Sequence, residues 1–101
     1  MYKEIILYNL APDTTDEMYA EYVKNKKGPF FESLNGVEKF TLVKITDSKK
    51  GEIPYRYIGI VYVSDIDQFR ASQGSKEFGE FFKEWSQKVS DFHVLSGEVI
   101  F

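Results

Sequence analysis

The heptapeptide Tyr57-Ile58-Gly59-Ile60-Val61-Tyr62-Val63 is the most informative part of the sequence, because its side chains are apolar or aromatic at both odd and even positions. Successive side chains of a β-strand point to opposite faces of the sheet, so a strand with one face in water alternates between apolar and polar residues. This heptapeptide does not alternate in that way. It therefore predicts a strand, over residues 55–63, that is covered on both faces.

Three more strands are predicted around it, over residues 2–10, 37–46 and 92–101. The first strand stops at the turn signal Ala11-Pro12-Asp13. A polar loop that contains Gly51 and Pro54 separates the second strand from the third. The order of these segments indicates a hairpin in the middle of the chain.

Helices are predicted in the two remaining connections. Thr14 with Glu17, and Ser64 with Asp67, have the spacing of capping boxes, which begin helices. The first helix runs into Lys26-Lys27-Gly28-Pro29. A further helix carries an apolar stripe at helical spacing, which predicts packing against the core. This helix begins near Ser75, and its stripe consists of Phe78, Phe81, Phe82, Trp85 and Val89.

The β-α-β-β-α-β order predicts one α+β domain over residues 1–101, with a ferredoxin-like antiparallel four-stranded sheet and helices on one face. The helix-free face then needs a cover. The first strand is also apolar on both faces, with Ile5 and Leu7 on one and Ile6 and Tyr8 on the other. Two-fold dimers are the commonest oligomers, so a second copy is the simplest cover. We therefore expect a homodimeric α/β barrel around a ligand cavity.

Composition limits the functions to be considered. The net charge of -3 argues against nucleic acid as a partner, because such binding relies on clustered Lys and Arg. The chain has no cysteine, which excludes disulfides, thiolate metal sites and a thiol nucleophile. We expect no metal, no membrane span and no signal peptide, hence a cytoplasmic protein. Aromatic residues make up 17% of the chain, more than a two-layer core of this size needs.

The RNA-recognition fold has the same β-α-β-β-α-β order of elements as this chain. Residues 5–10 resemble its first-strand motif. That fold stacks bases on aromatic side chains at set strand positions, and here Ile6, Ile58 and Ile60 occupy them. The stacking surface is missing.

Three segments, residues 34–42, 57–69 and 95–100, resemble the RedY and HapK-like proteins of bacterial clusters for prodiginine-type pyrrole and indole pigments. The resemblance covers roughly the C-terminal two thirds and implies a dimeric α/β barrel. It also implies a pathway protein that acts on a flat, apolar heteroaromatic intermediate without a metal or redox cofactor. One position departs from the family pattern, because members often carry a carboxylate where this chain has Tyr62.

The candidate catalytic residues are His93, Glu98 and Asn9. His93 is the only histidine and so the only side chain whose ordinary pKa is near neutrality. A glutamate inside an aromatic cavity has its pKa raised by desolvation, which is the role considered for Glu98. Asn9, at the end of the first strand, could orient a substrate. Each also has a structural interpretation: a hydrogen-bonded edge histidine, a solvated glutamate and a turn asparagine.

The candidate ligand-binding residues are strand side chains that remain after the helix stripe is assigned to the core. They are Tyr8, Phe40, Tyr57, Tyr62 and Ser96. Apolar walls supply binding energy and a few polar groups fix the geometry for condensation, cyclisation or proton transfer.

Two other functions stay open. One is a carrier that shields a reactive intermediate. The other is a cofactor-free monooxygenase of the antibiotic-biosynthesis type, which Asn9, Trp85 and His93 suggest as residue types. We expect Trp85 to pack against the sheet, where it cannot join the other two.

Overall fold

The computed structural model describes residues 1–101, and its sheet has the strand order β2-β3-β1-β4. All neighbouring strands are antiparallel, which confirms the predicted α+β ferredoxin-like fold. The elements are β1 (Tyr2–Leu10), α1 (Asp16–Tyr22), the π-helical turn η1 (Val23–Lys27), α2 (Gly28–Ser33), β2 (Val37–Lys44), β3 (Tyr57–Val63), α3 (Ile66–Gln73), α4 (Lys76–Ser86) and β4 (Val89–Glu98).

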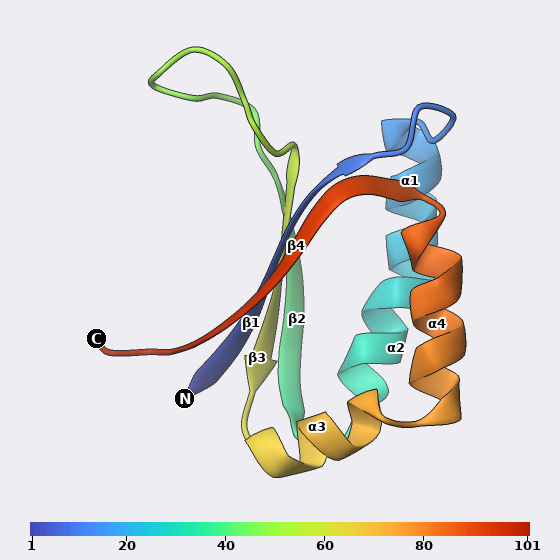
Figure 1. The fold of residues 1–101 in the computed structure, drawn as a ribbon, viewed down its shortest axis with the longest axis vertical. Coiled ribbons are helices and arrows are strands. Elements are labelled where there is room, and N and C mark those ends of the chain that lie inside the picture. The colour runs from blue at the N-terminus through green and yellow to red at the C-terminus, as the bar shows by residue number, and fades with distance from the viewer.

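The helices α1, α2 and α4 lie on one side of the sheet, and α3 lies at its end (Figure 1). In β1 the side chains of Glu4, Ile6 and Tyr8 are buried on the helix side, while Ile5 and Leu7 are half-buried on the other side. β3 shows the same pattern of buried and half-buried positions. The helix-free side of the sheet therefore carries apolar side chains that no helix of the chain covers. None of the helices is long and apolar enough to cross a membrane.

Two of the three predicted helix starts are displaced by one residue. The N-cap of α1 is Thr15, which accepts a hydrogen bond from the Met18 amide, and the N-cap of α3 is Asp65. The capping boxes predicted from Thr14 and Ser64 were therefore wrong, because a neighbouring residue with an equally suitable side chain takes each position. The third prediction is confirmed, since Ser75 caps α4.

The first helical segment does not end at the sequence Gly28-Pro29. Instead it passes through η1, a turn with i to i+5 hydrogen bonds, directly into α2. Proline is tolerated here because it occupies the first turn of α2, where its missing N–H has no partner within that helix. A Cβ on Gly28 would lie 3.0 Å from the carbonyl oxygen of Val23, so this turn favours glycine.

The predicted strand bounds differ from the observed ones mainly at the C-terminal strand. β4 begins at Val89 rather than Phe92, because Val89 pairs with Leu10 and does not continue the stripe of α4. The ladder shifts opposite Tyr8, and Asp91 adopts a φ of 51° there. Such a shift is typical of a β-bulge, which bends the strand. β2 and β3 are each two residues shorter than predicted, at the ends that join the polar loop.

The core lies between the helices and the sheet, as the stripe of α4 predicts for Trp85, which is 3% exposed. Phe82 is 38% exposed, so the stripe is not buried along its whole length. The uncovered part of the stripe borders the cavity described next.

Candidate functional site

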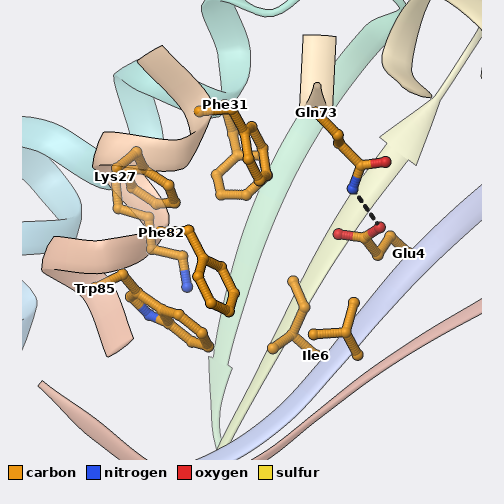
Figure 2. A pocket seen from close by; sticks show the side chains of 10 residues that line it. Glu4, Ile6, Lys27, Phe31, Gln73, Phe82 and Trp85 are labelled. Atoms are coloured by element: carbon orange, nitrogen blue, oxygen red, sulfur yellow. Dashed lines mark hydrogen bonds between the residues drawn. The ribbon is translucent and has the colours of Figure 1, made fainter. Parts of the chain in front are cut away.

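A cavity opens between the sheet and the helices, on the side of the sheet that carries α2 and α4 (Figure 2). Its volume is about 70 Å³. A water molecule needs about 10–15 Å³ on such a measure, so the cavity has room for several waters or one small ring. Ten residues line it: Glu4, Ile6, Lys27, Phe31, Gln73, Phe78, Phe81, Phe82, Trp85 and Val94.

Lys27 is placed in this cavity by the π-helical turn. It is the last residue of η1, and its neighbours Lys24 and Lys26 are exposed while Lys27 itself is 1% exposed. Its Nζ donates hydrogen bonds to the hydroxyls of Tyr8 and Tyr19, both at 3.2 Å. Isolated π-helical turns occur frequently at functional sites, because they redirect a side chain that a regular helix would place elsewhere.

The surroundings of Lys27 favour the neutral amine. No carboxylate forms an ion pair with it, and burial lowers the pKa of Lys27 to about 7. Aromatic faces act in the opposite direction, and the nearest ring centroid, that of Trp85, lies 4.6 Å from Nζ. The ring centroids of Tyr8, Phe40 and Tyr19 also lie within 5.8 Å of Nζ, and each such contact stabilises the cation. Full burial shifts a pKa by up to about 3–5 units, and this desolvation is the cause of the lowered pKa of Lys27.

Glu4 approaches the cavity from the sheet. It belongs to β1, points to the helix side and is 6% exposed. Its Oε2 accepts a hydrogen bond of 3.0 Å from Nε2 of Gln73, at the end of α3 (Figure 2). Burial raises the pKa of Glu4, and the hydrogen bond from Gln73 offsets part of that effect. The protonated form is therefore more populated near neutral pH than in an ordinary glutamate.

The rest of the lining is mostly aromatic, with Ile6 and Val94 as its aliphatic members, and further aromatic rings support it from behind. Phe30 and Phe81 stack with ring centroids 4.5 Å apart, and Phe31 stacks on Phe40 at 5.1 Å. The indole N–H of Trp85 donates a 2.9 Å hydrogen bond to the Tyr19 hydroxyl, which orients the indole ring at the cavity. A flat, uncharged ring would make offset or edge-on contacts with such walls.

The arrangement places an acid and a base in one apolar cavity. Lys27 comes from the helix side and Glu4 from the sheet, and they form no ion pair with each other. Groups whose environments move their pKa values toward neutrality are suited to general acid and base catalysis. No group of three or more His, Asp or Glu side chains comes together in a way that could hold a metal ion.

Three of the predicted ligand-binding residues lie behind the cavity wall. Tyr8 is fully buried and shares a 2.6 Å hydrogen bond with Tyr19. Phe40 is covered by Phe31, and the Tyr57 hydroxyl donates to Asp16. The structure thus brings Tyr8 into contact with Lys27 but places neither Phe40 nor Tyr57 in the lining.

Three other predicted residues lie on the helix-free side of the sheet. Asn9 bonds to the backbone of the β2–β3 loop, donating to the Pro54 carbonyl and accepting from the Arg56 amide. His93 pairs with Leu7 across the ladder and is exposed. Tyr62 lies beneath the ammonium groups of Lys3 and Lys39, at 4.6 and 5.0 Å. Any ligand contact by these three would have to occur on the face opposite to the cavity.

Ser96 and Glu98 lie on the exposed end of β4, opposite Glu4 and Tyr2 respectively. Neither lines the cavity. The role considered for Glu98, a glutamate in an aromatic cavity, is instead the environment of Glu4.

Sequence reasoning missed Glu4, Lys27 and Gln73. The sequence does contain a pattern that points to Glu4. Glu4 alternates in step with Ile6 and Tyr8 along the first strand, and a charged residue on the same face as core residues suggests a functional role. Lys27 had no comparable signal, since it ends the polar run Lys24-Asn25-Lys26-Lys27.

Solved structures with similar folds include three informative proteins. HapK from Hahella chejuensis has a TM-score of 0.80 at 19% identity, with 99% of this chain and 93% of that chain covered. SnoaB, a cofactor-independent oxygenase from Streptomyces nogalater, has a TM-score of 0.77 at 15% identity, with coverage of 99% and 93%. A dimeric ferredoxin-like protein of unknown function from Thermobifida fusca has a TM-score of 0.71 at 13% identity, with coverage of 97% and 90%.

At these identities the structural likeness shows the fold alone. No curated protein sequence matches the chain significantly. The family model described as REDY-like protein HapK, however, matches residues 2–100, which is nearly the whole chain. The segments 34–42, 57–69 and 95–100, which resemble this family, all fall within the match. The chain therefore belongs to the HapK family of REDY-like proteins.

Proposed function

We propose that this protein binds a small, flat, uncharged aromatic compound of the pyrrole or indole type and promotes its condensation, cyclisation or another proton-transfer step. It would do so without a cofactor, as a pathway protein of secondary-metabolite or prodiginine-type pigment biosynthesis. Family membership and the structural likeness to SnoaB, a cofactor-independent oxygenase, support a role in biosynthesis. The single observation that carries the proposal is the cavity, which has aromatic walls and both Lys27 and Glu4 in its lining.

The roles of the two polar residues follow from their environments. Neutral Lys27 removes a proton from the bound compound, and protonated Glu4 supplies a proton to a different atom of the same compound. Gln73 holds the Glu4 carboxyl in position through its hydrogen bond. Such proton transfers contribute about 10²–10⁴-fold to a rate, and aromatic contacts orient the ring.

Binding can be measured through Trp85, which is the only tryptophan and lines the cavity. Pyrrole should change its fluorescence in a saturable way, and indole, which is itself fluorescent, can be followed by calorimetry. The Kd should be no tighter than about 3 µM for pyrrole, because small ligands gain at most about 1.5 kcal/mol per heavy atom. Tyr62→Phe, on the opposite face, is the matched control and should bind as the unchanged protein does.

An enzyme can be distinguished from a non-catalytic carrier by measuring, with NMR, the rate of hydrogen exchange at the pyrrole ring carbons in D₂O. Exchange requires a deuteron to be added to the ring and a proton to be removed. The protein should accelerate it at least about tenfold over buffer, and Lys27→Met and Glu4→Gln should each lose most of that gain. Glu98→Gln should retain it. Binding without exchange would favour the carrier, and no binding would contradict both.

A cofactor-free oxygenase is less well supported. Trp85 borders the cavity, but Asn9 and His93 lie on the other face of the sheet, so the three residues do not form one site within the chain.

We also propose that two copies associate through the helix-free face of the sheet. That face carries the half-buried side chains of Ile5, Leu7, Ile58 and Ile60, and Leu95 beside them is 52% exposed. Soluble monomers rarely leave a large apolar patch open. The similar fold from Thermobifida fusca is that of a dimeric protein. Sedimentation should give twice the chain mass of 11.8 kDa, and a stable monomer at micromolar concentration would contradict the proposal.

A further inference from the structure

We propose that Lys27 binds its substrate covalently, as an imine formed with an aromatic aldehyde or ketone that occupies the cavity. The inference rests on the proposed function, because the carbonyl compound has to enter the same cavity. It goes further in naming a carbonyl group as the feature of the substrate that is recognised.

The first support is the position of the amine. Lys27 is almost fully buried, yet its side chain lines the cavity, so a ligand in the cavity lies against it. The hydroxyls of Tyr8 and Tyr19 hold Nζ from the core side, and the ring of Trp85 lies along it. An amine that forms an imine has to lie close to the carbonyl carbon, and the absence of a carboxylate partner favours the neutral amine that attacks it. Lys27 meets both conditions.

The second support is the protonation state. Only a neutral amine has the lone pair that attacks a carbonyl. At pH 7 an ordinary exposed lysine amine is neutral in roughly one molecule in 10³ or fewer. Burial, with the pKa lowered to about 7, makes Lys27 neutral in about half of the molecules. Its rate advantage over exposed lysines from this factor alone is about 10³-fold.

A purely structural role explains these features less well. A lysine that serves only to bond two tyrosine hydroxyls carries the cost of burying an ammonium group, which an apolar or amide side chain of similar length would avoid. Here a π-helical turn directs Lys27 inward, while Lys26 one residue earlier is exposed. The chain thus places an amine without a carboxylate partner beside a cavity.

The chemistry balances with the groups present. The Nζ lone pair forms a bond to the carbonyl carbon while the carbonyl oxygen gains a proton and the nitrogen loses one, which gives a carbinolamine. The carbon–oxygen bond then breaks, water leaves with a second proton, and the nitrogen lone pair forms the protonated imine, which becomes the neutral imine when the nitrogen returns its remaining proton to the Glu4 carboxylate. Protonated Glu4, held by Gln73, is the acid in the lining that can supply protons to the oxygen. No oxidant or reductant is consumed.

The test uses the full chain with pyrrole-2-carbaldehyde and sodium cyanoborohydride, which reduces an imine to a stable secondary amine. Intact mass spectrometry should show one adduct per chain at pH 7, and peptide mapping should place it on Lys27. The variant Lys26→Arg, which changes the exposed neighbour, should be labelled on Lys27 at the same rate as the unchanged protein. Lys27→Arg should lose at least about 90% of the labelling, with circular dichroism showing that it is folded.

The outcomes separate the inference from the function on which it rests. If labelling of the unchanged protein is spread evenly over several lysines, the proposal of a specific imine at Lys27 is wrong, whether or not the variants fold. If pyrrole quenches Trp85 and pyrrole-2-carbaldehyde does so too, but no adduct forms on Lys27, the imine is refuted while the aromatic-binding function stands. If neither compound binds, both fail. If the adduct forms on Lys27 alone and pyrrole competes with it, both are supported.

Discussion

Replacing Trp85 with alanine should lower the free energy of unfolding by about 3–5 kcal/mol, which is the usual cost of truncating a buried aromatic side chain to alanine. Trp85 is almost fully buried and contacts the rings of Tyr8 and Phe92, at centroid distances of 5.2 and 5.3 Å. Its loss also removes the N–H that bonds to Tyr19. Urea denaturation followed by circular dichroism measures the effect without relying on tryptophan fluorescence.

Two further variants show where the stability comes from. Trp85→Phe keeps an aromatic ring but loses the hydrogen bond to Tyr19, so it should be intermediate between the unchanged protein and Trp85→Ala. Phe82→Ala, on the same helix, should cost clearly less, because Phe82 is already partly in water. If Trp85→Ala unfolded at the same urea concentration as the unchanged protein, the side chain would not be a core residue at all.

Lys27 should make a contribution to stability that rises between pH 7 and pH 9, while buried Glu4, whose pKa is raised, acts in the opposite direction. In this range the unfolded chain holds a proton on Lys27, whereas the folded chain, with the pKa lowered to about 7, has released it. Stability rises with pH wherever the unfolded state binds more protons, and the gain over two pH units is on the order of 2 kcal/mol. Below pH 7 both states are protonated, so the penalty for burying the ammonium group is then present in full.

Lys27→Met should remove this pH dependence while Lys26→Met, the exposed neighbour, should keep it. Measurements stay below about pH 9.5, because burial raises the pKa values of Tyr8 and Tyr19 and ionisation of these tyrosines in the unfolded chain lowers stability at higher pH. Denaturation curves at half-unit pH steps give the slopes. Equal slopes for the protein and Lys27→Met would show that Lys27 keeps an ordinary pKa in the fold.

The fold was largely predictable because its signals are local. The alternating and two-sided apolar patterns gave β1 with its observed bounds, and Ser75 marked the start of α4. Where neighbouring residues can serve the same purpose, as with Thr14 and Thr15, the sequence does not decide between them. The start of β4 was misplaced for a similar reason, since Val89 fits both the stripe of α4 and the strand that follows.

The site was much harder to predict because its contacts are distant in sequence. The glutamate that lies in the cavity is Glu4, and its hydrogen-bond partner Gln73 is 69 residues away. Lys27 points inward from a π-helical turn, and such turns are rare, so a regular helical pattern does not predict its direction. Read alone, a run rich in lysine predicts a solvated helix face. The strand residues Tyr62, His93 and Asn9 have suitable side-chain chemistry, but the sequence does not show which strand parity faces the helices.

The most direct test of the account is an NMR titration of the protein with ¹³C-labelled lysine side chains. One Cε resonance should titrate near pH 7, disappear in Lys27→Arg and shift when pyrrole is added, because a half-neutral Lys27 lies at the wall of the cavity. If every lysine instead titrates near the ordinary value of about 10.4 and none responds to pyrrole, the cavity is not the functional site and Lys27 is neither base nor nucleophile.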